Sequence, residues 1–186
     1  MSFTKSQLLR MVELYGEPDR LTTLQEMTPG ELEMVRSSMK DGRAHDITIY
    51  IKKEGGYIFI AKPFYPPELF RAPSGGARPD EDIETGAKRE ALEETGVEIE
   101  LERYILHIDV RFQTGDDYID WTSHVFSANY VSGEIKPQDD HEIREARLIY
   151  EEQIPGFIEL MLNSGSGGLR YRAYLTRETE KRLQSS

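Results

Sequence analysis

Residues 75–97 read GGARPDEDIETGAKREALEETGV and contain the most informative pattern in the chain. Asp82 is a good helix N-cap, and Glu84 stands in the first turn, where the helix dipole favours an acidic side chain. Gly96 can end the helix, because glycine adopts the left-handed conformation of a C-terminal cap without strain. The stretch therefore predicts a helix over about residues 83–95, preceded by a glycine-rich loop.

Three glutamates of this helix, Glu90, Glu93 and Glu94, are spaced at i, i+3 and i+4 and therefore share one face. Like charges at this spacing destabilise an isolated helix by roughly 0.2–0.5 kcal/mol per pair, so Glu94→Gln is expected not to reduce stability. A hard divalent cation with oxygen ligands would offset the repulsion. The alternative is a solvated acidic surface that binds no ion.

The residues around these glutamates favour the cation. They resemble the signature of the Nudix hydrolases, GX5EX7REUXEEXGU, in which U is a bulky aliphatic residue. The matching positions are Gly75, Glu81, Arg89-Glu90, Glu93-Glu94 and Gly96-Val97. Ala91 departs from the pattern because it is small, and Ser74 replaces the glycine that commonly precedes the signature. The flanking strand order extends the resemblance to about residues 45–163.

The resemblance implies an α/β fold, namely an α/β/α sandwich around a mixed β-sheet. It implies a hydrolase that cleaves the pyrophosphate linkage of a nucleoside diphosphate joined to another moiety, with water activated by Mg²⁺ or Mn²⁺. Arg89 is expected to orient the carboxylates through an ion pair with Glu81. The implied metal ligands are the Gly75 carbonyl group, Glu90, Glu93 and Glu94.

Residues outside the signature are candidates for the remaining roles. Glu142 lies where many family members place another acidic residue that binds metal or acts as a base, and His141 is an alternative base. Three cationic side chains flank the glycine-rich loop and can bind phosphate oxygens, unless they are plain surface charges: Lys62, Arg71 and Arg78. Three aromatic residues near a predicted hairpin turn can stack on a base, unless they belong to the core: Phe112, Tyr118 and Trp121.

The rest of the chain predicts the elements around the signature helix. Residues 46–51 and 57–61 predict a hairpin, and further strands are expected near residues 101–112, 119–131 and 146–150. Helices are expected near residues 153–162 and 169–183. The first forty residues are predicted to be helical, with a helix start at Thr28-Pro29-Gly30-Glu31. We therefore expect a helical extension over residues 1–44 and a Nudix domain over residues 45–186. The amphipathic extension packs either on that domain or on a second subunit, which would form a homodimer.

Composition excludes several classes of function. The chain has 186 residues, and Lys+Arg 23 against Asp+Glu 34 gives a net charge of -11, which disfavours nucleic acids and anionic membrane surfaces as partners. With 0 Cys, thiol catalysis and disulfides are excluded. The first twenty residues lack a signal-peptide pattern, and no run of eighteen apolar residues occurs. A cytoplasmic protein that acts on a small nucleotide-type molecule is expected.

The sequence leaves the substrate open. No proline occurs between Pro79 and Pro137, although the ADP-ribose subfamily usually carries one shortly after the signature. A second reading is a Nudix-like module that binds or senses a nucleotide without cleaving it. Such modules typically lose one or more of the signature glutamates, and here all four are present.

Overall fold

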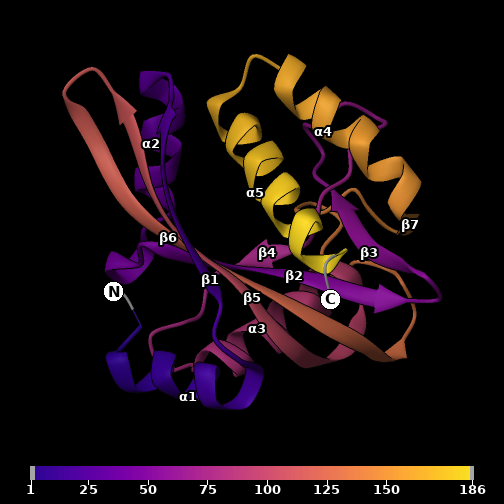
Figure 1. Ribbon diagram of the computed structural model, residues 1–186. Coiled ribbons are helices and arrows are strands. Elements are labelled where there is room, and N and C mark those ends of the chain that lie inside the picture. Colours follow the sequence, from indigo (N-terminus) through magenta and orange to yellow (C-terminus); the bar gives the residue numbers. More distant parts are fainter. Residues whose placement is uncertain (1–2, 185–186) are drawn as a thin grey trace.

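The computed structural model describes residues 3–184, apart from the side chain of Lys40. In that range one mixed sheet lies between two layers of helices (Figure 1). The strands are β1 (Asp19–Glu26), β2 (His45–Lys53), β3 (Gly56–Ala61), β4 (Ser74–Gly75), β5 (Val97–Thr114), β6 (Asp117–Gly133) and β7 (Glu145–Tyr150). They are arranged in the order β1-β5-β6-β2-β3-β7, and β4 pairs with β2. The predicted α/β/α sandwich is confirmed.

Helices cover both faces of the sheet (Figure 1). They are α1 (Lys5–Tyr15), α2 (Pro29–Ser38), α3 (Ile83–Thr95), α4 (Ile154–Asn163) and α5 (Gly167–Leu183), with short 3-10 turns at Lys40–Gly42 and Glu151–Gln153. The apolar sides of α1 and α3 pack on one face, and those of α2, α4 and α5 pack on the other. In the described residues, no helix has the length and apolar character needed to cross a membrane.

Strand β2 holds the signature loop in the middle of the sheet. Its apolar residues are fully buried, which suits a strand with helices over both faces. The end of β2 pairs with β3 through the predicted hairpin turn, and its first half pairs with β4, where Ile47 faces Gly75. The first glycine of the signature is therefore fixed by backbone pairing to a buried strand.

The prediction that the first forty residues are helical is wrong between α1 and α2. Residues Asp19–Glu26 form β1, which pairs in parallel with β5 from Asp19↔Leu106 to Glu26↔Gln113. β1 lies at the edge of the sheet, and its side chains alternate only between exposed and half-buried. Because few of its residues are strongly apolar, the period of two is weak in the sequence, and pairing with the long β5 decides the conformation.

Glu31 connects the start of α2 to the start of α5. Its carboxylate accepts hydrogen bonds from the backbone N–H of Thr28 at 2.9 Å and from the Ser166 hydroxyl group at 2.7 Å. Burial by itself would raise the pKa of Glu31, but the hydrogen bonds from Thr28, Ser166 and Gly168 lower it to about 2. A lowered carboxyl pKa means that the ionised form stabilises the fold.

We expect Glu31→Gln to destabilise the protein by about 1–2 kcal/mol at neutral pH, after allowance for solvent screening. The stabilisation is present above the ordinary pKa of glutamate and is lost as the pH falls toward 2, so the difference from wild type should vanish there. Urea unfolding at several pH values between 7 and 2 measures this, with the exposed Glu33→Gln as the control. A difference that stays constant over this range would contradict the assignment.

Candidate active site

The signature helix begins and ends as its sequence predicts. The Asp82 side chain accepts a hydrogen bond from the backbone N–H of Thr85 at 2.8 Å, and Gly96 adopts the left-handed conformation with φ 78°. Ala91, the departure from the signature, is fully buried with Ile83 and Ala87 against the sheet. The small apolar side therefore faces the sheet and leaves the carboxylates on the other side of the helix.

Arg89 holds the first part of the carboxylate cluster together. Its guanidinium group donates two hydrogen bonds to Glu81, at 2.7 and 2.9 Å, and one each to Glu90 at 2.8 Å and Glu93 at 2.9 Å. A further hydrogen bond, at 2.9 Å, reaches the carbonyl oxygen of Gly76. One cation thus fixes three carboxylates and the glycine-rich loop. The expected pair between Arg89 and Glu81 is present with bidentate geometry.

Glu94 has different partners from its two neighbours. Its side chain is buried, accepts a hydrogen bond from the backbone N–H of Ser74 at 2.7 Å, and lies 3.3 Å from the Lys62 ammonium group. The same ammonium group lies 2.9 Å from Glu142. Lys62 therefore bridges the signature helix and the loop before β7.

The loop before β7 is fastened onto the end of the signature helix. The backbone N–H of Gln138 donates to the carbonyl oxygen of Glu93 at 3.0 Å. The Asp139 side chain accepts hydrogen bonds from the backbone N–H groups of His141 and Glu142 at 2.9 and 3.3 Å. This turn presents Glu142 toward the helix and leaves the His141 side chain almost fully exposed.

These segments enclose a cavity of about 350 Å³ that contains five carboxylates. It is lined by Glu90, Glu93, Glu94, Gln138, Asp139, Glu142 and Ile143. Burial raises the pKa of Glu90, although Arg89 opposes this effect. Hydrogen bonds from Arg89 lower the pKa of Glu81, which is not among the residues that line the cavity. The cavity is therefore strongly acidic, and the two cations Arg89 and Lys62 offset only part of the charge of its five carboxylates.

Gly75 lies directly against the carboxyl group of Glu90. A Cβ atom at position 75 would overlap that group, so only glycine lets the strand approach it so closely. Carboxylate and carbonyl oxygens are the ligands that a hard divalent cation prefers, and the residues present fit such an ion. In the described range, however, no three Asp, Glu or His side chains lie close enough together in their present conformations to hold a metal ion. In this arrangement Arg89 donates hydrogen bonds to Glu90 and Glu93, and Lys62 is paired with Glu94.

The predicted phosphate-binding cations occupy three different settings. Lys62 is at the wall of the acidic cavity. Arg78 is exposed and lies 3.3 Å from Glu93. Arg71 is buried, and its guanidinium group donates to Tyr65 Oη, the Ala72 carbonyl oxygen and Ser74 Oγ. Arg71 thus supports the strand before Gly75 and is not among the residues that line the cavity, and its contact with phosphate stays a prediction.

The predicted aromatic stacking residues do not line the acidic cavity. Phe112 is buried in the core below α5, with its ring 5.1 Å from that of Tyr171. Trp121 is also buried, and its Nε1 donates to Asp46 at 2.8 Å. Phe112 lines neither cavity, whereas Trp121 lines a second cavity away from the acidic one, so stacking of either ring on a base stays a prediction. Tyr118 is exposed beside the β5–β6 turn, with the Arg111 guanidinium group 4.0 Å from its ring.

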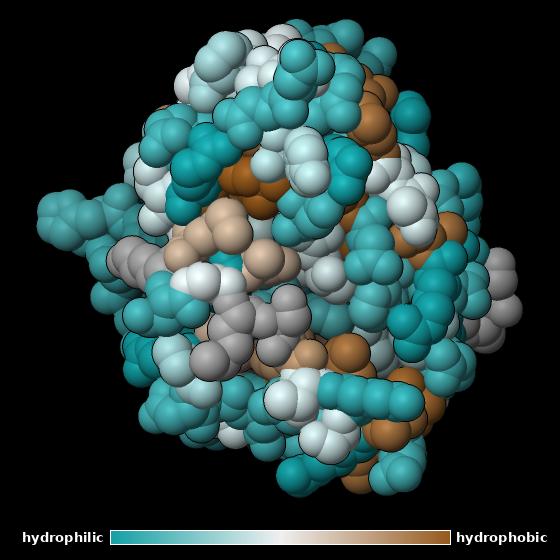
Figure 2. Space-filling view, turned by 90° about the vertical axis from the view of Figure 1, so that its left-hand side faces the viewer, coloured by the Kyte–Doolittle hydropathy of each residue, from teal (hydrophilic) through white to brown (hydrophobic). Residues whose placement is uncertain are grey.

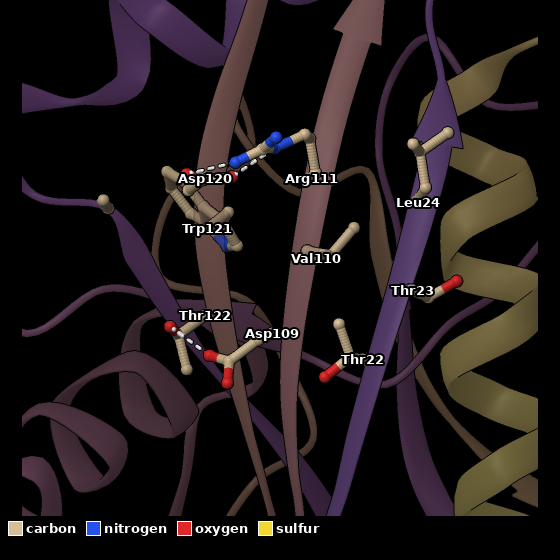
Figure 3. A pocket seen from close by; sticks show the side chains of 10 residues that line it. Thr22, Thr23, Leu24, Asp109, Val110, Arg111, Asp120, Trp121 and Thr122 are labelled. Atoms are coloured by element: carbon tan, nitrogen blue, oxygen red, sulfur yellow. Dashed lines mark hydrogen bonds and ion pairs between the residues drawn. The ribbon is translucent and has the colours of Figure 1, made fainter.

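A larger cavity, of about 710 Å³, lies on the open part of β1, β5 and β6 (Figure 3). Arg111 on β5 donates a hydrogen bond to Asp120 on the neighbouring strand β6 at 2.7 Å, and Thr122 donates to Asp109 at 3.0 Å. Its charged groups therefore satisfy one another, and it holds no cluster of carboxylates. Figure 2 shows the face that carries the free end of the β5–β6 hairpin, where hydrophilic residues surround smaller hydrophobic patches.

Sequence reasoning missed the roles of four residues that shape the acidic cavity or the loop beside it. Asp139 and Gln138 line the cavity, and the Ser74 backbone holds Glu94. Arg144 binds the carbonyl oxygens of the proline-rich loop after Lys62. The only sequence signal for Asp139 is its place in the acidic run Asp139-Asp140-His141-Glu142, and the long-range contacts of Ser74 and Arg144 leave no local pattern.

Comparisons with known proteins identify the family of this chain. The family model described as the NUDIX domain matches residues 42–165, which include the signature helix and the loop before β7. The "Oxidized purine nucleoside triphosphate hydrolase" of Mus musculus is 27% identical over 117 residues, covering 63% of this chain and 72% of that protein.

Solved structures share the fold. A NUDIX hydrolase from Nitrosomonas europaea aligns with a TM-score of 0.53 and 20% identity, over 76% of this chain and 73% of that one. A MutT protein from Methanosarcina mazei Go1 aligns with a TM-score of 0.54 and 21% identity, over 77% and 94%. Because the family model spans more than half of the chain and the signature residues form one acidic cavity, the chain belongs to the Nudix family and is a Nudix pyrophosphohydrolase.

Proposed function

We propose that the protein hydrolyses the pyrophosphate linkage of a nucleoside diphosphate joined to a second moiety, and that it does so with Mg²⁺ or Mn²⁺. The observation that carries this proposal is the acidic cavity, in which the signature glutamates meet Glu142 beside a glycine that leaves them room. Five carboxylates in so small a space would repel an anionic substrate unless cations neutralise them.

The residues proposed to hold the cation are Glu90, Glu93 and Glu94, with the carbonyl group of Gly75. A bound divalent cation would neutralise phosphate charge and make water more acidic at this point. The chain's own part is to fix the ligands, because Arg89 and the Gly75 strand set the direction of the carboxylates before any substrate arrives. Arg89 is therefore a positioning residue.

Glu142 is proposed as the proton acceptor for the attacking water. Its carboxylate lines the cavity opposite the signature helix and is held by Lys62 at 2.9 Å. It is more exposed than Glu94, so water can reach it. Lys62 and Arg78 are proposed to contact phosphate oxygens, since both lie beside the cavity carboxylates and have ammonium or guanidinium groups that can turn toward an anion.

The test is a hydrolysis panel with Mg²⁺ and with Mn²⁺, in which products are identified by mass. It includes ADP-ribose, NADH, nucleotide sugars, dinucleoside polyphosphates and nucleoside triphosphates. Cleavage between two phosphorus atoms that stops in excess chelator is the expected result. Nucleotide binding without turnover in any of these mixtures would instead support the binding-module reading.

Lys62→Met is expected to tighten binding of Mn²⁺ to the substrate-free protein about tenfold. The reason is that the Lys62 ammonium group, which is mostly buried, bridges Glu94 and Glu142 and competes with any other cation for them. Calorimetric titration with Mn²⁺ measures the change. Lys52→Met, which removes an exposed lysine paired with Glu102, is the control and should leave affinity unchanged. Equal or weaker affinity in the Lys62 variant would show that the ammonium group does not compete.

A further inference from the structure

Phe64 is a large apolar side chain that is exposed to solvent, two residues after Lys62 in the chain. It is 75% exposed, more than any other large apolar residue in the described range. Its ring contacts that of Tyr65 edge-on, with centroids 5.0 Å apart. Single exposed apolar residues are common on protein surfaces, so exposure alone indicates nothing. The setting of Phe64 distinguishes it.

The segment that carries Phe64 is held in place from both sides. Arg144 donates to the carbonyl oxygens of Tyr65 at 2.8 Å and Pro67 at 3.0 Å, and the buried Arg71 donates to Tyr65 Oη at 3.0 Å. Pro63, Pro66 and Pro67 restrict the backbone further. A ring presented on a fixed loop loses little conformational freedom when it binds a ligand.

The same segment begins in the acidic cavity. Lys62, two residues before Phe64, contacts both Glu94 and Glu142. Two residues span at most about 7 Å, so the backbone of Phe64 lies within about 7 Å of the backbone of Lys62, whose ammonium group contacts the cavity carboxylates. Arg144 follows Glu142 by two residues and binds this loop, which ties the two segments together. A phosphate group near Lys62 would thus place its attached group within reach of the phenyl ring.

We propose that Phe64 is the platform on which the nucleobase of the substrate stacks. The proposal rests on the proposed function, because it assumes that the phosphates lie in the acidic cavity. A rigid aromatic ring next to a cation suits a ligand that is planar at one end and anionic at the other. Stacking of this kind tolerates any base, so it selects nucleotides over base-free diphosphates but does not choose among bases.

The test compares binding of ADP with binding of inorganic pyrophosphate, by calorimetry in the presence of Mg²⁺. Phe64→Leu should weaken ADP binding about 5- to 150-fold and leave pyrophosphate binding within about twofold. Phe64→Trp should keep ADP affinity, because it preserves the flat ring. Tyr150→Leu is the control, because Tyr150 is another exposed aromatic residue. It lies at the end of β7 that pairs with Gly56, five residues from Glu145, which pairs with Ala61 next to Lys62. This variant should change neither the ADP nor the pyrophosphate affinity.

Unchanged thermal unfolding of the Phe64 variants is expected, since the side chain is exposed. The proposal is overturned if Phe64→Leu leaves ADP binding unchanged, if it weakens ADP and pyrophosphate equally, or if wild type does not bind ADP. The two proposals fail separately. Base-dependent binding through Phe64 without any turnover would refute the hydrolytic function alone, whereas turnover without this dependence would refute the stacking role alone.

Discussion

Glu94→Gln is expected to lower kcat/KM by roughly a hundred- to several-thousand-fold, which corresponds to about 3–5 kcal/mol of transition-state stabilisation. Glu94 is buried between the Ser74 backbone and Lys62, and it faces a cavity with four other carboxylates. The amide keeps the shape and can still accept the hydrogen bond from Ser74. It removes a full negative charge from a proposed ligand of a hard cation.

The measurement pairs turnover at saturating Mg²⁺ with unfolding in chelator. Glu100→Gln, an exposed acid on β5, is the control and should match wild type in both. A Glu94 variant that keeps more than about a tenth of wild-type turnover, a loss below roughly 1.4 kcal/mol, would remove Glu94 from the site. The structure changes the expectation for stability. Because Lys62 would lose a buried partner, we expect a modest decrease where the isolated helix predicts none.

Arg89→Met is expected to destabilise the protein by about 3–5 kcal/mol, because it leaves mostly buried carboxylates without their cation. Only 16% of the Arg89 side chain and 11% of the Glu81 side chain are exposed, so solvent cannot replace the lost pair. For a chain of this size the melting temperature should fall by roughly 6–20 °C. Catalysis should also be lost, since Glu90 and Glu93 would no longer be held in place.

A second variant separates lost charge balance from lost packing. Glu81→Gln combined with Arg89→Met removes the carboxylate that makes two hydrogen bonds to Arg89. The double variant should be more stable than Arg89→Met alone by about 1–2 kcal/mol, which is a non-additive effect of two residues in contact. Calorimetric unfolding of all four proteins in the cycle measures it. If the two losses simply add, Glu81 and Arg89 do not interact energetically.

Local sequence rules were sufficient for the signature helix and the hairpin that carries its loop. Asp82 and Gly96 set the ends of α3, and residues 46–51 and 57–61 form β2 and β3 as expected. The helix caps depend on contacts between residues four or fewer positions apart, and the hairpin pairs run from Lys53↔Gly56 to Ile51↔Ile58, so both features have a local pattern in the sequence. The shared face of Glu90, Glu93 and Glu94 is equally local, because it follows from helix geometry.

The family, the fold class and the carboxylates that gather on one helix could therefore be predicted from local sequence patterns. Tertiary structure decided how each one is held. Glu94 meets Ser74 and Lys62 from other segments, and Lys62 meets Glu142, which is 80 residues away in the chain. Tertiary structure also made Asp19–Glu26 a strand, placed Phe112 and Trp121 in the core, and left Phe64 exposed. Burial, ion pairing and edge-strand pairing depend on which distant segments come into contact. The local sequence pattern carries no information about those contacts.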